Sequence, residues 1–149
     1  MPTSLKLIQG PPGGGKSRRV MELMESGEAD VAIEFQPIYA ALKAQRRGAD
    51  GHYPIRNTDV PDPLAALAGY VMHSTLREAS RRDMRIVMTT SKPDRAQSMS
   101  ELAIDLGIQD FSTEIVDPGQ DVVTDRLREA FDSDECAKGI GRWYLGGGR

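Results

Sequence analysis

A run of eight residues near the N-terminus has a composition and spacing that suit phosphate binding. The run fits the pattern G-x-x-x-x-G-K-S and consists of Gly10, Pro11, Pro12, Gly13, Gly14, Gly15, Lys16 and Ser17. Glycines allow backbone N–H groups to converge on an anion, because no side chain stands in the way. The lysine adds a positive charge for the phosphates, and the serine hydroxyl is a ligand for Mg²⁺. The pattern therefore predicts a nucleotide-binding P-loop, with ATP and Mg²⁺ as the expected ligands.

Phosphoryl transfer also needs groups that act on the acceptor and on the transferred charge. Glu34 follows the second apolar run of the chain and is the best candidate for a general base. An exposed carboxylate, or one paired with an arginine, is an equally weighted alternative. Arg126 is the best candidate for an arginine that closes over the phosphates, with a solvated helix face as the alternative. Arg18 is a candidate to lie near the nucleotide, with plain surface charge as its alternative.

The third expected strand ends without the acid that often helps to hold Mg²⁺. Thr89 and Thr90 occupy this place, and their hydroxyls bring hydrogen-bonding capacity without charge. Strand propensity followed by a helix cap is the simpler interpretation of both threonines. Asp117 is interpreted as a turn or cap residue after the fourth strand. The pair Trp143 and Tyr144 is interpreted as a packing anchor rather than a platform for a nucleotide base.

Strands and helices are expected to alternate along most of the chain. Short apolar runs predict strands at residues 4–9, 30–35, 84–90 and 110–116. Apolar periodicity and helix caps predict helices at residues 16–26, 37–47, 63–82, 92–106, 120–131 and 133–144. Residues 48–62 are rich in glycine, proline and polar residues, and their length marks them as a candidate functional loop. This order predicts an α/β fold in which a parallel sheet carries helices on both faces.

Composition excludes several classes of protein. A chain of 149 residues fits one domain over residues 1–149, and 39% hydrophobic residues can form a core. No apolar run is long enough for a membrane span, and the N-terminus is too polar for a signal peptide, so a cytoplasmic location is expected. One cysteine, Cys136, and two histidines exclude a disulfide framework or a multi-cysteine zinc site. The net charge of -3 argues against nucleic-acid binding driven by bulk charge.

The chain resembles the P-loop kinase group that includes phage-type polynucleotide 5′-hydroxyl kinases and zeta-toxin-like kinases. The run from residue 10 to residue 17 matches that group fully, and residues 85–95 resemble its third strand and the following helix. Thr89 stands where the group has an aspartate. Arg126 falls at its lid-arginine position, and Glu34 falls near its base aspartate. Residues 136–144 are also similar to small P-loop proteins of actinobacterial phages and prophages.

The resemblance implies a three-layer P-loop NTPase fold with a parallel sheet ordered 2-3-1-4. It also implies a C-terminal helical lid over about residues 119–145, with ATP and Mg²⁺ as cofactors. Its activity would be transfer of the γ-phosphate to a hydroxyl of a nucleoside, a nucleotide or a polynucleotide 5′ end. In this hypothesis Lys16 and the loop amides hold the phosphates, Ser17 binds Mg²⁺, Glu34 orients the acceptor and Arg126 closes from the lid.

A second hypothesis follows from the missing strand-end acid. The protein would then be an ATPase or a nucleotide-gated binding module without an acceptor, for example a phage assembly or accessory protein. A third hypothesis is a structural subunit that keeps the loop without binding nucleotide. The sequence leaves all three open, with the kinase as the leading interpretation.

Overall fold

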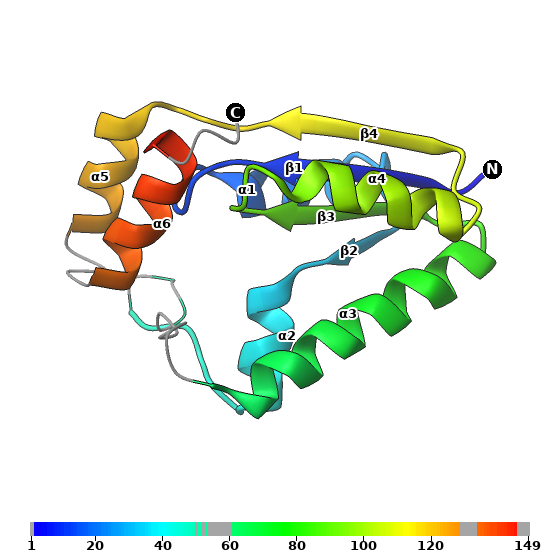
Figure 1. Ribbon diagram of the computed structural model, residues 1–149, viewed down its shortest axis with the longest axis horizontal. Helices are drawn as coiled ribbons and strands as arrows, with labels where there is room; N and C mark the ends of the chain where they lie inside the picture. The colour runs from blue at the N-terminus through cyan, green and yellow to red at the C-terminus, as the bar shows by residue number, and fades with distance from the viewer. Residues whose placement is uncertain (1, 50, 52, 54–60, 129–133, 146–149) are drawn as a thin grey trace.

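One parallel sheet forms the centre of the protein (Figure 1). The computed structural model describes residues 2–49, 51, 53, 61–128 and 134–145. The strands are β1 (Ser4–Gln9), β2 (Val31–Ile33), β3 (Arg85–Thr90) and β4 (Asp110–Ile115). Their order across the sheet is β2-β3-β1-β4, and every pairing is parallel. The sheet order implied by the sequence resemblance is thereby confirmed.

Helices connect each strand to the next. They are α1 (Lys16–Glu25), α2 (Phe35–Leu42), α3 (Pro63–Arg81), α4 (Arg95–Asp105), α5 (Gln120–Arg128) and α6 (Asp134–Leu145). Parallel strands require such crossovers, because consecutive strands must all run in the same direction. The pair α5 and α6 follows β4 and stands beyond the carboxyl ends of the strands, at the left of Figure 1. No helix in the described segments combines the length and the apolar character needed to cross a membrane.

The core has two parts because strand side chains alternate between the two faces of the sheet. Leu5 and Leu7 of β1 belong to a cluster with Leu76 of α3 and Met99 of α4. Ile8 faces the other way and packs in a second cluster with residues of α1 and β3. Helices therefore cover both faces of the sheet. Because the strands are parallel, their carboxyl ends all lie at the same edge.

The region after β2 differs most from the sequence prediction. Residues 30–35 were expected to be a strand, but β2 ends at Ile33 and α2 begins at Phe35. Pro37 then lies in the first turn of α2, where its missing N–H removes no helical hydrogen bond. The helix ends at Leu42 instead of residue 47, and Ala44 follows with a positive φ of 55°. Glu34 is consequently the extended N-cap residue of α2, not a strand residue.

The other boundaries agree with the sequence prediction to within about three residues. The expected helix at 92–106 begins only at Arg95, because the Thr90 hydroxyl accepts a hydrogen bond from the Lys92 amide in the preceding turn. Most of the expected loop at 48–62, residues 129–133 and the tail after residue 145 lie outside the described residues. Cys136 lies in α6, and its side chain is outside the described part of the chain.

Candidate active site

The glycine-rich run forms a tight loop between β1 and α1. At its start the Gly10 amide donates to the Thr90 carbonyl at 3.2 Å, and within it the Gly14 amide donates to the Pro11 carbonyl at 3.0 Å. Gly15 has a φ of 97°, a conformation that side-chain-bearing residues avoid. A Cβ atom on Gly10 would collide with the Val116 carbonyl just after β4. The loop therefore depends on glycine both for its turn and for its contact with β4.

This loop opens the first turn of α1 at the carboxyl edge of the sheet. The first N–H groups of a helix have no acceptors within the helix, and the helix dipole adds positive potential there. The loop thus has the arrangement that binds anions in other proteins.

Lys16 lies folded against this loop. Its Nζ donates to the carbonyls of Gly10 at 3.0 Å and Pro11 at 2.7 Å. Burial lowers the pKa of Lys16 from 10.5 to about 8, and the negative charge of Glu34 opposes that shift. An anion at the loop would favour the charged ammonium, because it would restore part of the lost solvation.

Glu34 lies directly beside the first turn of α1. Its Oε1 accepts a hydrogen bond of 3.0 Å from the Ser17 hydroxyl and another of 3.3 Å from the Thr89 hydroxyl. Among the residues that the structure describes, it forms no ion pair with an arginine, which was one alternative interpretation of this residue. The structure therefore brings Glu34, which was selected from a separate part of the sequence, beside Ser17 of the glycine-rich run.

Helix α5 contacts the opposite side of the loop. Arg126 donates from Nη1 to the Gly13 carbonyl at 3.1 Å, and its side chain is exposed. Leu127 is buried against Gly13, where a Cβ atom would come within 3.0 Å of its side chain. Arg18 lies exposed on α1 and lines the same cleft as the loop. Arg126 thus contacts the loop directly, whereas Arg18 lines the cleft beside it.

Asp117 has a structural role, as the favoured interpretation of the sequence proposed. Its carboxylate accepts hydrogen bonds from the Gly119 amide at 3.0 Å, from Trp143 Nε1 at 3.3 Å and from the Tyr144 hydroxyl at 2.6 Å. Trp143 is only 1% exposed. The expected role of Trp143 and Tyr144 as a packing anchor is therefore confirmed, and their partner is Asp117, just after β4. No local pattern predicts this pairing, because Asp117 and Tyr144 are 27 residues apart in the chain.

A large cleft of about 1290 Å³ surrounds the loop and the Glu34 cluster. Its floor is apolar and includes Met72, Leu76, Met88 and Met99. Among the described residues, its charged lining is mainly basic, with eight lysines or arginines and three acids. The basic residues are Lys16, Arg18, Arg19, Arg47, Lys92, Arg95, Arg126 and Arg142, and the acids are Glu22, Glu34 and Asp117. A chain with a net charge of -3 thus gathers positive charge in this cleft.

Two aromatic residues of α2 were not selected from the sequence but line this cleft. The rings of Phe35 and Tyr39 stack with their centres 5.5 Å apart. The Tyr39 hydroxyl donates a hydrogen bond to Asp62, which also caps α3 by accepting from the Leu64 amide at 3.0 Å. This contact fixes α2 against α3, and so it fixes one wall of the cleft.

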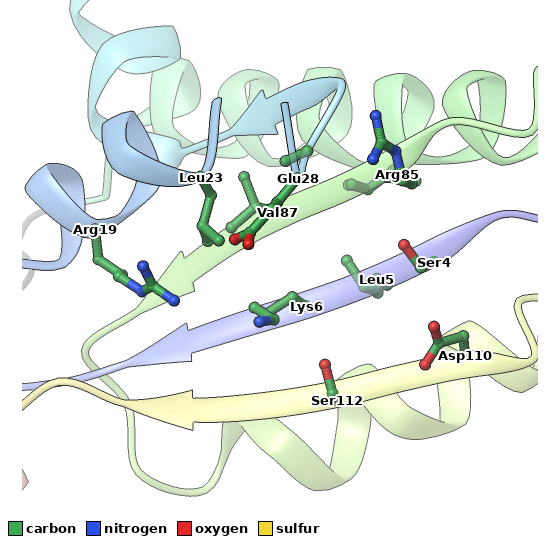
Figure 2. Close-up of a pocket in the computed structure, with 12 residues that line it drawn as sticks. Ser4, Leu5, Lys6, Arg19, Leu23, Glu28, Arg85, Val87, Asp110 and Ser112 are labelled. Atoms are coloured by element: carbon green, nitrogen blue, oxygen red, sulfur yellow. The ribbon is translucent and has the colours of Figure 1, made fainter. Parts of the chain in front are cut away.

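A second, smaller hollow of about 300 Å³ lies on the face of the sheet that α1 covers (Figure 2). Lys6 and Arg85 project into it from the strands, and Arg19 reaches it from α1. Arg19 binds Glu114 at 2.6 Å, and Arg85 binds Asp30 at 2.8 Å. Because these charges are paired within the protein, the hollow is a weaker candidate than the cleft.

Comparison with solved structures finds chains that share this architecture. Two similar chains come from structures titled "Structure of the Pnkp1/Rnl/Hen1 RNA repair complex" and "Structure of Pnkp1/Rnl/Hen1 complex", with TM-scores of 0.68 and 0.61. Identities are 10% over 95% of this chain and 12% over 84% of it. This chain spans 43% and 38% of the length of those two chains.

A third similar structure is the tunicamycin resistance protein of Deinococcus radiodurans, with a TM-score of 0.55. It shares 20% identity, and the alignment covers 95% of this chain and 78% of that one. No protein-family model and no curated protein sequence matches the chain. At these identities the likeness establishes the fold alone, which is an α/β fold with a parallel sheet in the order 2-3-1-4.

Proposed function

We propose that the protein is a phosphotransferase that moves the γ-phosphate of ATP to a hydroxyl group. The observation that carries this proposal is the convergence of Lys16, Ser17 and Glu34 at one loop, with Arg126 reaching the same loop from α5. Lys16 and Ser17 begin α1, Glu34 precedes α2 and Arg126 belongs to α5, and each has a chemistry that phosphoryl transfer uses. The P-loop kinase-like fold supports the proposal.

The residues around the loop suit a triphosphate with its cation. The loop amides and Lys16 would hold the phosphates, and the oxygens of Ser17 and Glu34 are the ligand type that Mg²⁺ prefers. Bound there, Mg²⁺ would neutralise charge on the phosphates. Arg126 would turn from the Gly13 carbonyl to the phosphate oxygens, to which its planar guanidinium is matched.

The proposed transfer balances as a simple substitution at phosphorus. The acceptor oxygen forms a bond to the γ-phosphorus, and the bond from that phosphorus to the β–γ bridging oxygen breaks, which leaves ADP. The acceptor hydroxyl loses its proton in the same step. Glu34 can serve this reaction in two ways: it can receive that proton, as the sequence predicts, or it can help to hold the cation.

The acceptor is proposed to be a nucleoside, a nucleotide or a polynucleotide 5′ end. The basic lining of the cleft supports an anionic acceptor in addition to ATP, because its positive charges extend beyond the loop to Arg47, Lys92 and Arg95. The stacked rings of Phe35 and Tyr39 offer an aromatic surface on the same cleft. One similar structure is titled as an RNA repair complex, which agrees with this acceptor class.

A nucleotide-gated binding module remains the second candidate, because one observation favours it. The C-terminal helices contact the loop directly: Leu127 packs on Gly13, and Gly139 lies against Pro12. A nucleotide that changes the loop would therefore also shift α5 and α6, which a partner protein can recognise. In that case ATP is hydrolysed slowly or not at all, and no acceptor is modified.

The fate of labelled ATP tests the proposal. The protein is incubated with γ-labelled ATP, Mg²⁺ and a pool of nucleosides, nucleoside monophosphates and 5′-hydroxyl oligonucleotides, with Lys16→Ala as the blank. Label on one acceptor, absent with the variant, is the expected result and names the substrate class. Label that appears only as free phosphate, or remains on ATP, would contradict the kinase and favour the gated module.

A further inference from the structure

The Glu34 carboxylate lies where it can replace the acid that β3 lacks. Strand β2 pairs with β3 so that Ile33 stands beside Met88, and the next residues are Glu34 and Thr89. Oε1 of Glu34 lies 3.3 Å from the Thr89 hydroxyl and 3.0 Å from the Ser17 hydroxyl. Three oxygens, from the residue that links β2 to α2, from β3 and from α1, thus converge beside the first turn of α1.

From this geometry we infer that Glu34 and Ser17 hold the divalent cation of the bound nucleotide, and that Thr89 positions the carboxylate. The acid of the site then comes from the end of β2, through Glu34, instead of from β3. This inference rests on the proposed nucleotide site, and it gives Glu34 a role on the phosphate side of the cleft.

The other acids of the cleft are already engaged. Among the acidic residues that the structure describes there, Glu22 binds Arg19 at 3.3 Å. Asp117 accepts hydrogen bonds from one amide and two aromatic side chains. Glu34 differs, because its two donors are hydroxyl groups.

A carboxylate that accepts hydrogen bonds from hydroxyl groups can still bind a cation, whereas one paired with an arginine is already neutralised. A hydroxyl hydrogen rotates freely, so the same oxygen can turn a lone pair toward a cation. Ser17 can therefore change from donor to ligand without moving its oxygen away from Glu34. Magnesium in nucleotide sites is typically bound by one or two carboxylates together with phosphate oxygens and waters. One carboxylate and one serine hydroxyl satisfy the protein's share of that set.

The position of Glu34 favours this role over that of a general base. A base must reach the acceptor hydroxyl, which approaches the γ-phosphate from the side opposite ADP. Oε1 instead accepts its hydrogen bond from Ser17 at the start of α1, where the proposed site would hold the phosphates.

A rescue experiment tests the inference without depending on turnover. Affinity for the non-hydrolysable analogue β,γ-imido-ATP is measured with and without Mg²⁺, and bound Mn²⁺ is counted by electron paramagnetic resonance. The proteins are the wild type, Glu34→Gln, Thr89→Asp and the double variant. Glu22→Gln serves as the control, because this acid lines the same cleft but is paired with Arg19.

We expect Glu34→Gln to lose the Mg²⁺ dependence of nucleotide binding, and a carboxylate placed at residue 89 to restore it. Glu34→Gln should weaken metal affinity by about tenfold or more, in the range typical of altered metal sites, with little change in metal-free nucleotide binding. Thr89→Asp should recover most of that loss in the double variant, because it places a carboxylate at the end of β3. Glu22→Gln should behave as the wild type does.

The outcomes separate this inference from the proposed function. If nucleotide binding by Glu34→Gln keeps its full dependence on Mg²⁺, Glu34 does not hold the cation and the inference is wrong. If Thr89→Asp restores nothing, Glu34 does not replace an acid of β3, and that part of the inference is wrong. If Glu34→Gln keeps metal coupling but loses phosphoryl transfer, Glu34 is the general base. If the wild type binds neither the analogue nor Mn²⁺, the nucleotide site itself is wrong, and the inference fails with it.

Discussion

The Tyr144 hydroxyl donates a 2.6 Å hydrogen bond to the carboxylate of Asp117. Asp117 follows Val116, whose carbonyl lies against Gly10 and Gly14 of the phosphate-binding loop. Helix α6 is therefore fastened to the segment that supports the loop from the β4 side. The C-terminal helices are in this way part of the site, and their stability should affect the loop.

Removal of this hydroxyl should loosen the C-terminal helices. Tyr144→Phe is expected to reduce the free energy of unfolding by about 1.5–3 kcal/mol, the usual contribution of a hydrogen bond to a charged group. Urea unfolding measures the loss, and limited proteolysis after α5 reports whether α6 has detached. Tyr70→Phe is the matched control, because Tyr70 is 69% exposed on α3. Equal unfolding curves for both variants would contradict the anchoring role.

The two glycines of α6 should respond differently to alanine. A Cβ atom on Gly139 would lie 2.8 Å from Pro12 of the loop, whereas Gly141 has nothing within 4 Å. Alanine favours a helix by about 1 kcal/mol over glycine, so Gly141→Ala should raise the midpoint of urea unfolding. Gly139→Ala should fail to gain this stability, because the added methyl group forces α6 away from the loop. Equal gains for the two variants would show that α6 does not pack on Pro12.

Arg126 is expected to act on the transferred phosphate more than on stability. Arg126→Ala should reduce the rate of transfer by about 100-fold, the effect of losing one charge-stabilising donor in an active site. Its side chain is exposed, so the unfolding curve should hardly change. Single-turnover rates measure the effect, with Arg81→Ala at the end of α3 as the control. An unchanged rate for Arg126→Ala would leave this arginine as a surface contact to Gly13.

The pair of Asp30 and Arg85 should make stability depend on acidity. Hydrogen bonds from the side chain and amide of Arg85 lower the pKa of Asp30 from 3.8 to about 2. A carboxylate with a lowered pKa stabilises the fold above its unfolded pKa, and this contribution disappears as the pH falls through the folded one. Asp30→Asn should therefore melt below the wild type at pH 7, and the difference should shrink between pH 3.8 and 2. A difference in melting temperature that is independent of pH would contradict this account.

Local patterns predicted the elements near the loop well. The first strand was placed correctly at residues 4–9, because an apolar run that ends at a glycine-rich turn has few alternative structures. The end of β2 was misplaced because Glu34 and Phe35 continue an alternating pattern, and only the tertiary fold shows that a helix starts there. Glu34 was selected as a candidate base from its position along the chain alone. Its contact with Ser17 depends on how the strands are ordered.

Long-range contacts could not be predicted from the sequence. The pairing of Tyr144 with Asp117 and the contact of Gly139 with Pro12 join segments that no local pattern connects. The same holds for Tyr39 and Asp62, which lie on opposite sides of the long segment between α2 and α3. Such contacts depend on how the helices pack on the sheet, and several packing arrangements would bury the same hydrophobic residues.

Binding of ATP to the loop is the most direct test of the central claim. Isothermal titration with ATP and Mg²⁺ is performed on the wild type, on Lys16→Ala and on Lys6→Ala, whose lysine lies on β1 and contacts Glu114. The account predicts binding by the wild type and by Lys6→Ala, with an affinity about tenfold or more weaker for Lys16→Ala, as expected for a lost charged hydrogen bond. Absence of binding by the wild type at about 1 mM ATP, the upper end of ordinary substrate affinities, would contradict the account. Equal affinity of all three proteins would contradict it as well.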